Sequence, residues 1–391
     1  MKARPSPHSI RLPMFSSFNS CSIVMSANAQ LPAAVANAAP APGAPTAPTS
    51  PRFYDAEVVC MGRGIPRIVS PFDNLAGLVA EGYRHEEDEI RGNQVEYSRE
   101  RIRNFNAYRA LVGIVIPNFR ALTASMDATT IARFYAELDH GGLLARGGDI
   151  SALKKYTAEY VNAHVATILG DIPNNEYLSK LLDVDSREGR GVQHDLAGFL
   201  ICPIEHDWDN PVIRARVRAG EPGYHPSSSL FPRFLYENYK GDKNKIEEGF
   251  LRSSLLLACY IRIYLSLTSV QAPRASNPDP NPRSVAMRFQ LEKKVTPRTI
   301  AYIAMLVHFS LTNAAQWNKV VNHFSYHLFY NFIVDFFECP PGPLAAQRNE
   351  ELLAWWNCQV YGSQNPDIVQ LESSGRALEC QQIARESGQS T

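Results

Sequence analysis

The chain has 391 residues with 39 acidic and 39 basic side chains, so its formal net charge is zero and its pI is about 7.1. This balance provides no overall positive field to attract a phosphate backbone, so a nucleic-acid role would need a local basic patch. The seven cysteines are scattered and include no C-x-x-C pair. An odd set without a spacing pattern is typical of reduced thiols in an intracellular protein, and it argues against a disulfide-stabilised secreted domain.

The two ends of the chain differ in composition from its middle. Residues 27–50 are almost all Ala, Pro and small polar side chains, which bury too little apolar surface to offset the entropy of ordering them. The other end is rich in Gln, Ser and Glu. We therefore expect a disordered tail over residues 1–52, a folded domain over residues 53–362 and a flexible polar tail over residues 363–391.

The N-terminal residues have a second interpretation. Lys2, Arg4 and Arg11 precede the first carboxylate, Asp55, and serine is frequent between them, as it is in mitochondrial transit peptides. Three prolines in this stretch oppose the amphipathic helix that such peptides form. Mitochondrial targeting therefore stands as an alternative to a simple disordered tail.

Apolar side chains recur at helical spacing through the first half of the domain. A first helix is predicted over residues 96–116, where a proline stops it. Asp127 can cap a second helix, which ends at Gly141-Gly142. Asp149 can cap a third helix, which Gly170 ends.

The second half carries shorter signals. Residues 199–204, with the sequence FLICPI, predict a strand or a buried extended segment. Asn210 precedes a proline, a pattern that predicts the start of a short helix, which ends at Gly220. Thr296 also precedes a proline and predicts another helix start. The aromatic-rich residues 322–337 predict another helix.

The longest apolar run, residues 249–270, is predicted to be a central helix, and a second run covers residues 299–314. A helix that is apolar nearly all round is buried in a large core or spans a membrane. Arg252 and Arg262 lie within the first run, and each would cost roughly 2.5–3.5 kcal/mol near the centre of a bilayer. The run therefore predicts a buried core helix and no membrane span.

A last helix is predicted to begin at Asn349 and to end before Gly362. It contains Trp355 and Trp356, whose side chains point about 100° apart on a helix. We expect Trp355 to be buried against the central helix and Trp356 to be partly packed, with its indole N–H bonded at the rim. Because no β alternation or internal repeat is visible, the sequence predicts a mostly α fold: a single multi-helix globular domain with a buried central helix.

One candidate site mixes thiol, imidazole and carboxylate side chains, which are the ligand types of metal centres. Its members are His194, Cys202, His206 and Asp207, with Asp195, Glu205 and Asp209 nearby. Pro203 breaks the helix that would align Cys202 with His206. The alternative is turn and capping chemistry, in which these carboxylates satisfy backbone donors and pair with arginines.

Two further groups of residues are candidate sites, and each has an alternative interpretation. His323 and His327 have the i, i+4 spacing of zinc enzymes, but the glutamate of H-E-x-x-H is replaced by Phe324. The basic run Arg214, Arg216 and Arg218 precedes interleaved tyrosines, a pattern that can bind single-stranded nucleic acid. Flanking acidic residues balance this charge, so an ion-paired surface is the alternative.

Several motifs together resemble a known family. They are Arg190-Gly191, His194-Asp195, DWDNPVIRARVRAGE (207–221), GFLRSSLLLACY (249–260), VTPRTIAYIAMLVHFSL (295–311) and ELLAWWNCQVYG (351–362). The chain resembles an uncharacterised family of basidiomycete fungal proteins, which is catalogued only as a domain of unknown function. No activity, cofactor or catalytic residue follows from the resemblance. This chain differs from the usual pattern in residues 272–290, which are Pro-rich where family members are basic, and in residues 317–327.

The sequence as a whole is interpreted as a non-catalytic, intracellular helical protein that binds a partner protein or acts as a scaffold. Cytoplasm or nucleus is the expected compartment, and no cofactor is predicted. The candidates for partner binding are Arg214, Arg216, Arg218 and Trp356. Two alternatives stay open: a nucleic-acid-associated protein of mobile-element origin, and a metal-dependent enzyme that uses the cluster from Cys202 to Asp209.

Overall fold

The structure is a computed structural model that describes residues 55–170, 180–265, 281–291 and 293–362. The described part is mostly helical, which confirms the predicted fold class. Its one sheet is a hairpin of two short antiparallel strands. Within the described ranges, no helix combines the length and apolar character needed to cross a bilayer. The predicted disorder of both tails concerns residues outside these ranges.

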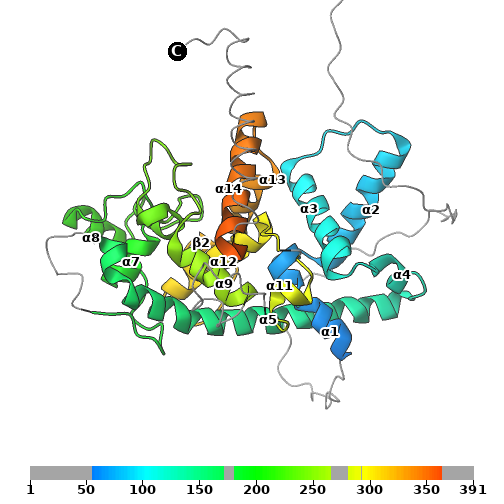
Figure 1. The fold of residues 1–391 in the computed structure, drawn as a ribbon, viewed down its shortest axis with the longest axis horizontal. Coiled ribbons are helices and arrows are strands. Elements are labelled where there is room, and N and C mark those ends of the chain that lie inside the picture. Colours follow the sequence, from blue (N-terminus) through cyan, green and yellow to red (C-terminus); the bar gives the residue numbers. More distant parts are fainter. Residues whose placement is uncertain (1–54, 171–179, 266–280, 292, 363–391) are drawn as a thin grey trace, which may run out of the picture. The chain divides into compact units, whose positions relative to one another are not determined.

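The elements follow one another along the chain as Figure 1 labels them. Those before residue 180 are α1 (Ala56–Gly62), the π-helical turn η1 (Ile65–Val69), α2 (Leu75–Arg91), α3 (Arg99–Ala110), the π-helical turn η2 (Leu111–Val115), α4 (Phe119–Thr123), α5 (Ala128–Ala163) and α6 (Val165–Leu169). Those after it are α7 (Asp195–Ile201), α8 (Pro211–Ala219), the 3-10 turns η4 (Arg233–Leu235) and η5 (Glu237–Tyr239), α9 (Ser254–Tyr264), α11 (Val285–Arg288), α12 (Pro297–Leu311), β1 (Val320–Val321), β2 (Phe324–Ser325), α13 (Tyr326–Glu338) and α14 (Pro343–Tyr361).

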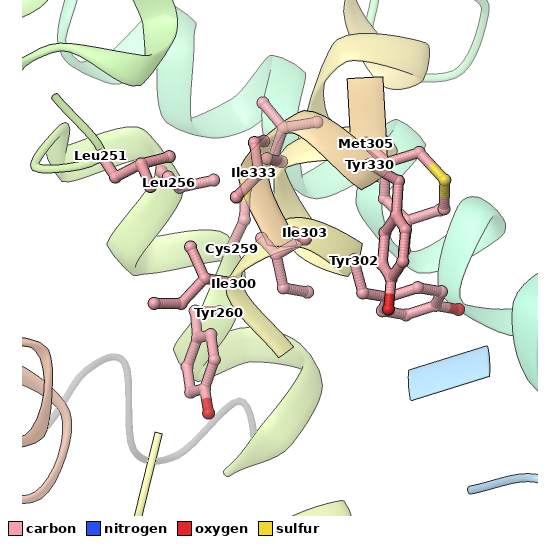
Figure 2. Close-up of a cluster of buried hydrophobic side chains, with 14 of the residues drawn as sticks. Leu251, Leu256, Cys259, Tyr260, Ile300, Tyr302, Ile303, Met305, Tyr330 and Ile333 are labelled. Carbon is pink, nitrogen blue, oxygen red and sulfur yellow. The ribbon is translucent and has the colours of Figure 1, made fainter. Parts of the chain in front are cut away.

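The most deeply buried element is α12, in which every residue after Pro297 is buried. Thr296 and Thr299 form a capping box at its start, with the proline at the first helical position, as the sequence predicted. Most of its side chains are apolar, and it packs against α5, α9 and α13. Figure 2 shows α12 side chains such as Ile303 among side chains from α9 and α13.

The predicted central helix over residues 249–270 is shorter than expected. Gly249 and Leu251 have positive φ, which keeps them out of the helix, and Ser253 caps α9 by accepting from the backbone N–H of Leu256. The end of the predicted range lies outside the described residues. Burial of α9 is confirmed, and its Arg262 lies over the ring of Tyr156 at 5.8 Å.

The largest difference from the sequence prediction is α5, a single 36-residue helix where two helices were expected (Figure 1). The predicted break at Gly141 and Gly142 is wrong, because this glycine pair serves packing. A Cβ atom on Gly141 would lie 2.1 Å from the carbonyl oxygen of Val59, so glycine lets α1 cross α5 backbone to backbone. Asp149 is not a cap but a buried residue, and its carboxylate pairs with Arg67 at 2.6 Å.

The remaining predicted helix starts and ends can be compared with the structure one by one. The caps at Asp127 and Asn210 are confirmed, and α8 ends at Gly220, whose φ is +65°. Asn349 does not start the last helix, which begins six residues earlier at Pro343; its side-chain amide instead donates to the carbonyl of Phe336 at 2.5 Å. Residues 199–204 were predicted to be a strand or a buried extended segment. The prediction is wrong for the first three of these residues, because α7 runs through Ile201. The helix predicted over residues 322–337 begins at Tyr326, after the β1–β2 hairpin.

Buried ion pairs connect elements that are distant in sequence. Arg298 of α12 donates from Nε to Glu338 of α13 at 2.8 Å. The same guanidinium donates to the carbonyl of Val69 at 2.6 Å and to the carbonyl of Arg103 at 2.7 Å. With a second bond to the Glu338 carboxylate, the guanidinium makes four hydrogen bonds. The two bonds to Val69 and Arg103 hold the N-terminal elements on the core.

Candidate functional site

The predicted metal cluster lies within residues 194–209, and the segment around Arg233 runs beside Cys202. The backbone N–H of Arg233 donates to the carbonyl of Cys202 at 3.1 Å, and that of Ile204 donates to the carbonyl of Phe231 at 3.2 Å. The four candidate side chains nevertheless have separate structural roles. His194 caps α7, since its Nδ1 accepts from the backbone N–H of Leu196 at 3.2 Å.

The remaining three candidates also make local contacts. The buried thiol of Cys202 donates to the carbonyl of Pro203 at a sulfur–oxygen distance of 3.5 Å. The ring of His206 stacks on Tyr224, and Asp207 accepts from the backbone N–H of Asp209 at 3.1 Å. No group of three His, Cys, Asp or Glu side chains in the described ranges could hold a metal ion. The geometry therefore matches turn and capping chemistry.

The environment of the cluster also opposes nucleophilic chemistry by its thiol near neutral pH. Burial raises the pKa of the Cys202 thiol to about 12, so the thiol keeps its proton. Burial lowers the pKa of His194 and of His206, so both imidazoles stay neutral.

The second histidine pair does not form a zinc site either. His323 has a φ of +68° in the β1–β2 turn, whereas His327 lies in α13. The Nε2 atom of His327 lies 3.1 Å from the side-chain amide nitrogen of Asn331. The i, i+4 spacing is therefore not helical at both positions, because the helix begins between the two residues.

The predicted basic run on α8 is engaged in contacts within the domain. Arg214 donates to the carbonyl of Trp208 at 3.3 Å. Arg216 pairs with Glu221 at 3.1 Å and lies over the ring of Tyr224. Arg218 pairs with Asp195 of α7 and lies over Trp208. Of the three, Arg216 pairs with a flanking acid as the ion-pair alternative predicted, whereas Arg218 pairs with an acid of another helix and Arg214 bonds to a backbone carbonyl.

Trp356, the last candidate for partner binding, is fully buried. Its indole N–H donates to the carbonyl of Leu251 at 3.1 Å, and its ring packs on Tyr260 at 5.3 Å. Trp355 is only partly buried and lies under the guanidinium of Arg252. The predicted order of burial for the two tryptophans is therefore wrong, and Trp356 presents no surface to a partner.

Unsatisfied polar atoms gather near the same two segments. Eleven buried side-chain N or O atoms in the described ranges lack a hydrogen-bond partner. Five of them lie on these two segments, on Glu205, His206, Trp208, Arg233 and Tyr236. A buried polar atom without a partner costs roughly 1–3 kcal/mol. The two segments thus hold nearly half of such atoms in the described ranges.

Sequence reasoning missed a pocket that lies between α1, η2 and α11. It encloses about 600 Å³, within the range of roughly 300–1,000 Å³ that small-molecule sites occupy. Its lining residues are Glu57, Cys60, Met61, Gly113, Ile114, Val115, Pro117, Arg288, Phe289, Gln290, Leu291, Lys294 and Thr296. They come from three sequence regions, and no local motif marks them, so only the tertiary structure reveals the site.

The pocket combines apolar walls with charged side chains at exposed positions. Phe289 and Leu291 are buried, whereas Glu57, Arg288 and Lys294 are exposed. The guanidinium of Arg288 donates to the sulfur of Cys60 across 3.5 Å. The pocket therefore offers an apolar surface with two cations and one carboxylate beside it.

A family model, described as a family of unknown function (DUF6698), matches residues 140–361, more than half of the chain. The chain belongs to this family. The predicted resemblance to a domain of unknown function is thereby confirmed. No curated protein matches the chain, and no solved structure does.

The matched range begins inside α5 and includes α7 to α14. The core helix α12 and the cluster around Cys202 both fall within it. The pocket combines matched residues such as Arg288 with α1 and η2 from the part of the chain before the match. The N-terminal elements of this chain therefore complete a site that the matched range only half contains.

Proposed function

We propose that this member of the family is a non-catalytic, intracellular helical binding protein, and that the pocket between α1, η2 and α11 is its binding site. The observation that carries the proposal is the pocket itself, where apolar walls meet exposed charged side chains. This combination is typical of ligand sites, in which apolar contact provides affinity and a few polar groups provide orientation.

The condition of the candidate reactive groups favours binding over catalysis. The thiol of Cys202 is protonated because burial raises its pKa to about 12, and the arginines of α8 hold the domain together. The metal-enzyme and nucleic-acid alternatives rested on these same residues. The geometry of the described residues adds no further support to either alternative, so we favour a binding protein.

The proposal extends to the compartment, which we expect to be the cytoplasm or nucleus. All five cysteines in the described ranges are free thiols: Cys60, Cys202, Cys259, Cys339 and Cys358. Free thiols persist where glutathione and thioredoxin keep them reduced. Thiol labelling of the denatured, unreduced protein should find these cysteines reactive, and paired disulfides would contradict an intracellular setting.

Retention of partners by pocket variants tests the binding function. Tagged full-length protein would be isolated from its native cells as three forms: the natural chain, the double variant Arg288→Glu/Lys294→Glu, and Arg283→Glu. Arg283 is exposed and does not line the pocket, which makes it the matched control. Mass spectrometry would then identify the proteins and small molecules retained by each form.

We expect at least one component to remain with the natural chain and with the control, and to be lost from the double variant. The melting temperature of all three forms would be measured beside the retention, so that a component lost from a double variant that melts like the natural chain reflects the pocket. Identical components in all three forms would contradict the proposal, as would a natural chain that retains none.

A further inference from the structure

Gly113 lies in the lining of this pocket, in the middle of the π-helical turn η2. We propose that the pocket accepts a ligand with an apolar chain or ring, and that Gly113 determines how large this apolar group can be. The inference rests on the proposed function, because it names the ligand class of the same pocket and a residue that selects among the members of that class.

The apolar part of the ligand follows from the walls. Met61 comes from α1, Ile114 from η2 and Phe289 from the end of α11, so apolar side chains line the pocket from three elements. Phe289 is anchored in the core and approaches Gly64, where a Cβ atom would lie only 2.6 Å from the ring. Met61 and Ile114 also pack against the core. These walls are therefore pre-formed, and an apolar ligand group would lose water without reorganising them.

Glycine at position 113 has no reason in the packing of the described residues. Gly113 is not among the glycines with positive φ, so its backbone conformation does not require glycine. A Cβ atom at this position would meet nothing within 4 Å in the described structure beyond the adjacent backbone of its own turn. Glycine in the interior of a helix is less stable than alanine, so Gly113 weakens η2 and gains no internal contact in return.

The missing side chain leaves room beside the walls. The other four residues of η2 have large apolar side chains: Leu111, Val112, Ile114 and Val115. Because Gly113 lines the pocket, a side chain there would occupy space at the pocket or its mouth. An apolar site discriminates between ligands by the room it has for each methylene. Gly113 therefore lets the pocket admit an apolar group that a larger residue would exclude.

Calorimetric titration of the full chain with hexanol, octanol and decanol tests the apolar part of the ligand. These alcohols are uncharged, so their binding reports contact with the walls and not the charge of the lining. Burial of one methylene stabilises a complex by about 0.8 kcal/mol, so affinity should increase by up to roughly fourfold for each added methylene. Octanol should also slow thiol labelling of Cys60, which lines the pocket, and leave labelling of the exposed Cys358 unchanged.

Two matched substitutions test the role of Gly113. Gly113→Leu adds a side chain at the pocket, whereas Gly147→Leu adds the same side chain at an exposed position of α5 that does not line it. Gly113→Leu should weaken decanol binding at least tenfold and hexanol binding less, because the shorter chain needs less room. Gly147→Leu should bind all three alcohols like the natural chain. Melting temperatures would confirm that both variants fold.

Gly113→Ala provides a test that does not depend on tolerance of the larger side chain. Its single methyl group should raise the melting temperature, because alanine is more stable than glycine in a helix interior. The same methyl group should weaken decanol binding by up to roughly fourfold, since it takes the room of about one methylene. A purely structural role for Gly113 would not make stability rise while affinity falls.

The inference is overturned if none of the alcohols binds, if affinity does not increase with chain length, or if Gly113→Leu binds decanol as tightly as the natural chain. These outcomes are distinct from failure of the proposed function. A cellular component that depends on Arg288 and Lys294, and that Gly113→Leu still retains, would support the binding function and reject the role of Gly113. Alcohol binding that Gly113→Leu weakens, without any retained component, would support the ligand class and reject the wider function.

Discussion

Trp355 and Trp356 are neighbours in sequence but have different environments. The ring of Trp356 is enclosed by the core and its N–H is satisfied by Leu251, whereas Trp355 lies partly exposed beside Arg252. Trp356→Ala should therefore lower the free energy of unfolding by roughly 3–5 kcal/mol, because it opens a large cavity. Trp355→Ala should cost about 1 kcal/mol.

Urea denaturation of both variants measures the difference. Their slopes against urea should match that of the natural chain, so that the midpoints report stability alone. Equal losses from both substitutions would show that the two rings contribute alike and would contradict the burial of Trp356.

Two buried tyrosines differ in whether the hydroxyl has a partner. The hydroxyl of Tyr302 donates to Asp149 at 2.9 Å, whereas the hydroxyl of Tyr236 is unsatisfied. Tyr302→Phe should cost roughly 1.5–3 kcal/mol, because it removes a hydrogen bond to a charged group. Tyr236→Phe should leave stability unchanged or raise it slightly. A loss above about 1 kcal/mol in Tyr236→Phe would show that its hydroxyl has a partner in solution.

The buried imidazole of His308 should make stability depend on pH. It stacks on Phe324 in the core, and burial lowers its pKa from 6.5 to about 3. Below pH 6.5 the unfolded chain therefore binds a proton that the folded chain does not, so stability falls as the pH decreases from 6.5 towards 3. At pH 5 this group should cost about 2 kcal/mol relative to pH 7.

Denaturation at pH 7, 6 and 5 measures this slope, and His308→Asn is the control because it cannot take up the proton. The variant starts from a lower stability, but its dependence on pH over this range should be shallower than that of the natural chain. Identical slopes would contradict the assignment and would direct attention to His194 and His206, whose pKa values are also lowered.

At the scale of single elements, α5 offers a test of why its glycines are present. Gly141 is packed against the backbone of α1, whereas a Cβ atom at Gly147 or Gly148 would meet nothing within 4 Å beyond the adjacent backbone of its own helix. Glycine in the interior of a helix is less stable than alanine by roughly 0.5–1 kcal/mol. Gly147→Ala and Gly148→Ala should therefore each raise the free energy of unfolding by about that amount.

Gly141→Ala is the matched substitution in the same helix, and it should destabilise the domain because the new methyl group would overlap the carbonyl of Val59. Thermal denaturation should show opposite signs for the two kinds of substitution. Stabilisation by all three would mean that α1 does not cross α5 as closely as described.

For the whole molecule, the N-terminal elements should be inseparable from the part that the family model matches. Arg298 of α12 is buried and depends on carbonyls at Val69 and Arg103, while Asp149 pairs with Arg67. Removal of residues 1–139 would take both carbonyl partners from Arg298 and the guanidinium partner from Asp149. Loss of one member of a buried ion pair alone costs roughly 3–5 kcal/mol, a large part of the 5–15 kcal/mol that stabilises a typical domain.

A fragment of residues 140–362 should accordingly be insoluble or lack a cooperative thermal transition. A fragment of residues 53–362 should melt close to the full chain, which also tests the predicted domain boundaries and the dispensability of both tails. A cooperative transition in the shorter fragment would show that the matched range folds alone.

The sequence alone determined the features that depend on neighbouring residues. Helical periodicity indicated a mostly α fold, and the caps at Asp127, Asn210 and Thr296 were predicted correctly, because a cap bonds within its own first turn. Of the acids that flank α8 in sequence, Glu221 pairs with Arg216 as predicted, whereas Arg218 pairs with Asp195 of α7, which sequence proximity did not indicate.

Tertiary structure decided what distant residues do to one another. Gly141 does not end α5 because α1 packs on it, and Trp356 rather than Trp355 is buried because of where Leu251 and Tyr260 lie. The pocket beside Arg288 is assembled from three separate regions of the chain, none of which carries a motif. Packing and burial are sums over contacts between distant segments, so periodicity within one segment cannot specify them.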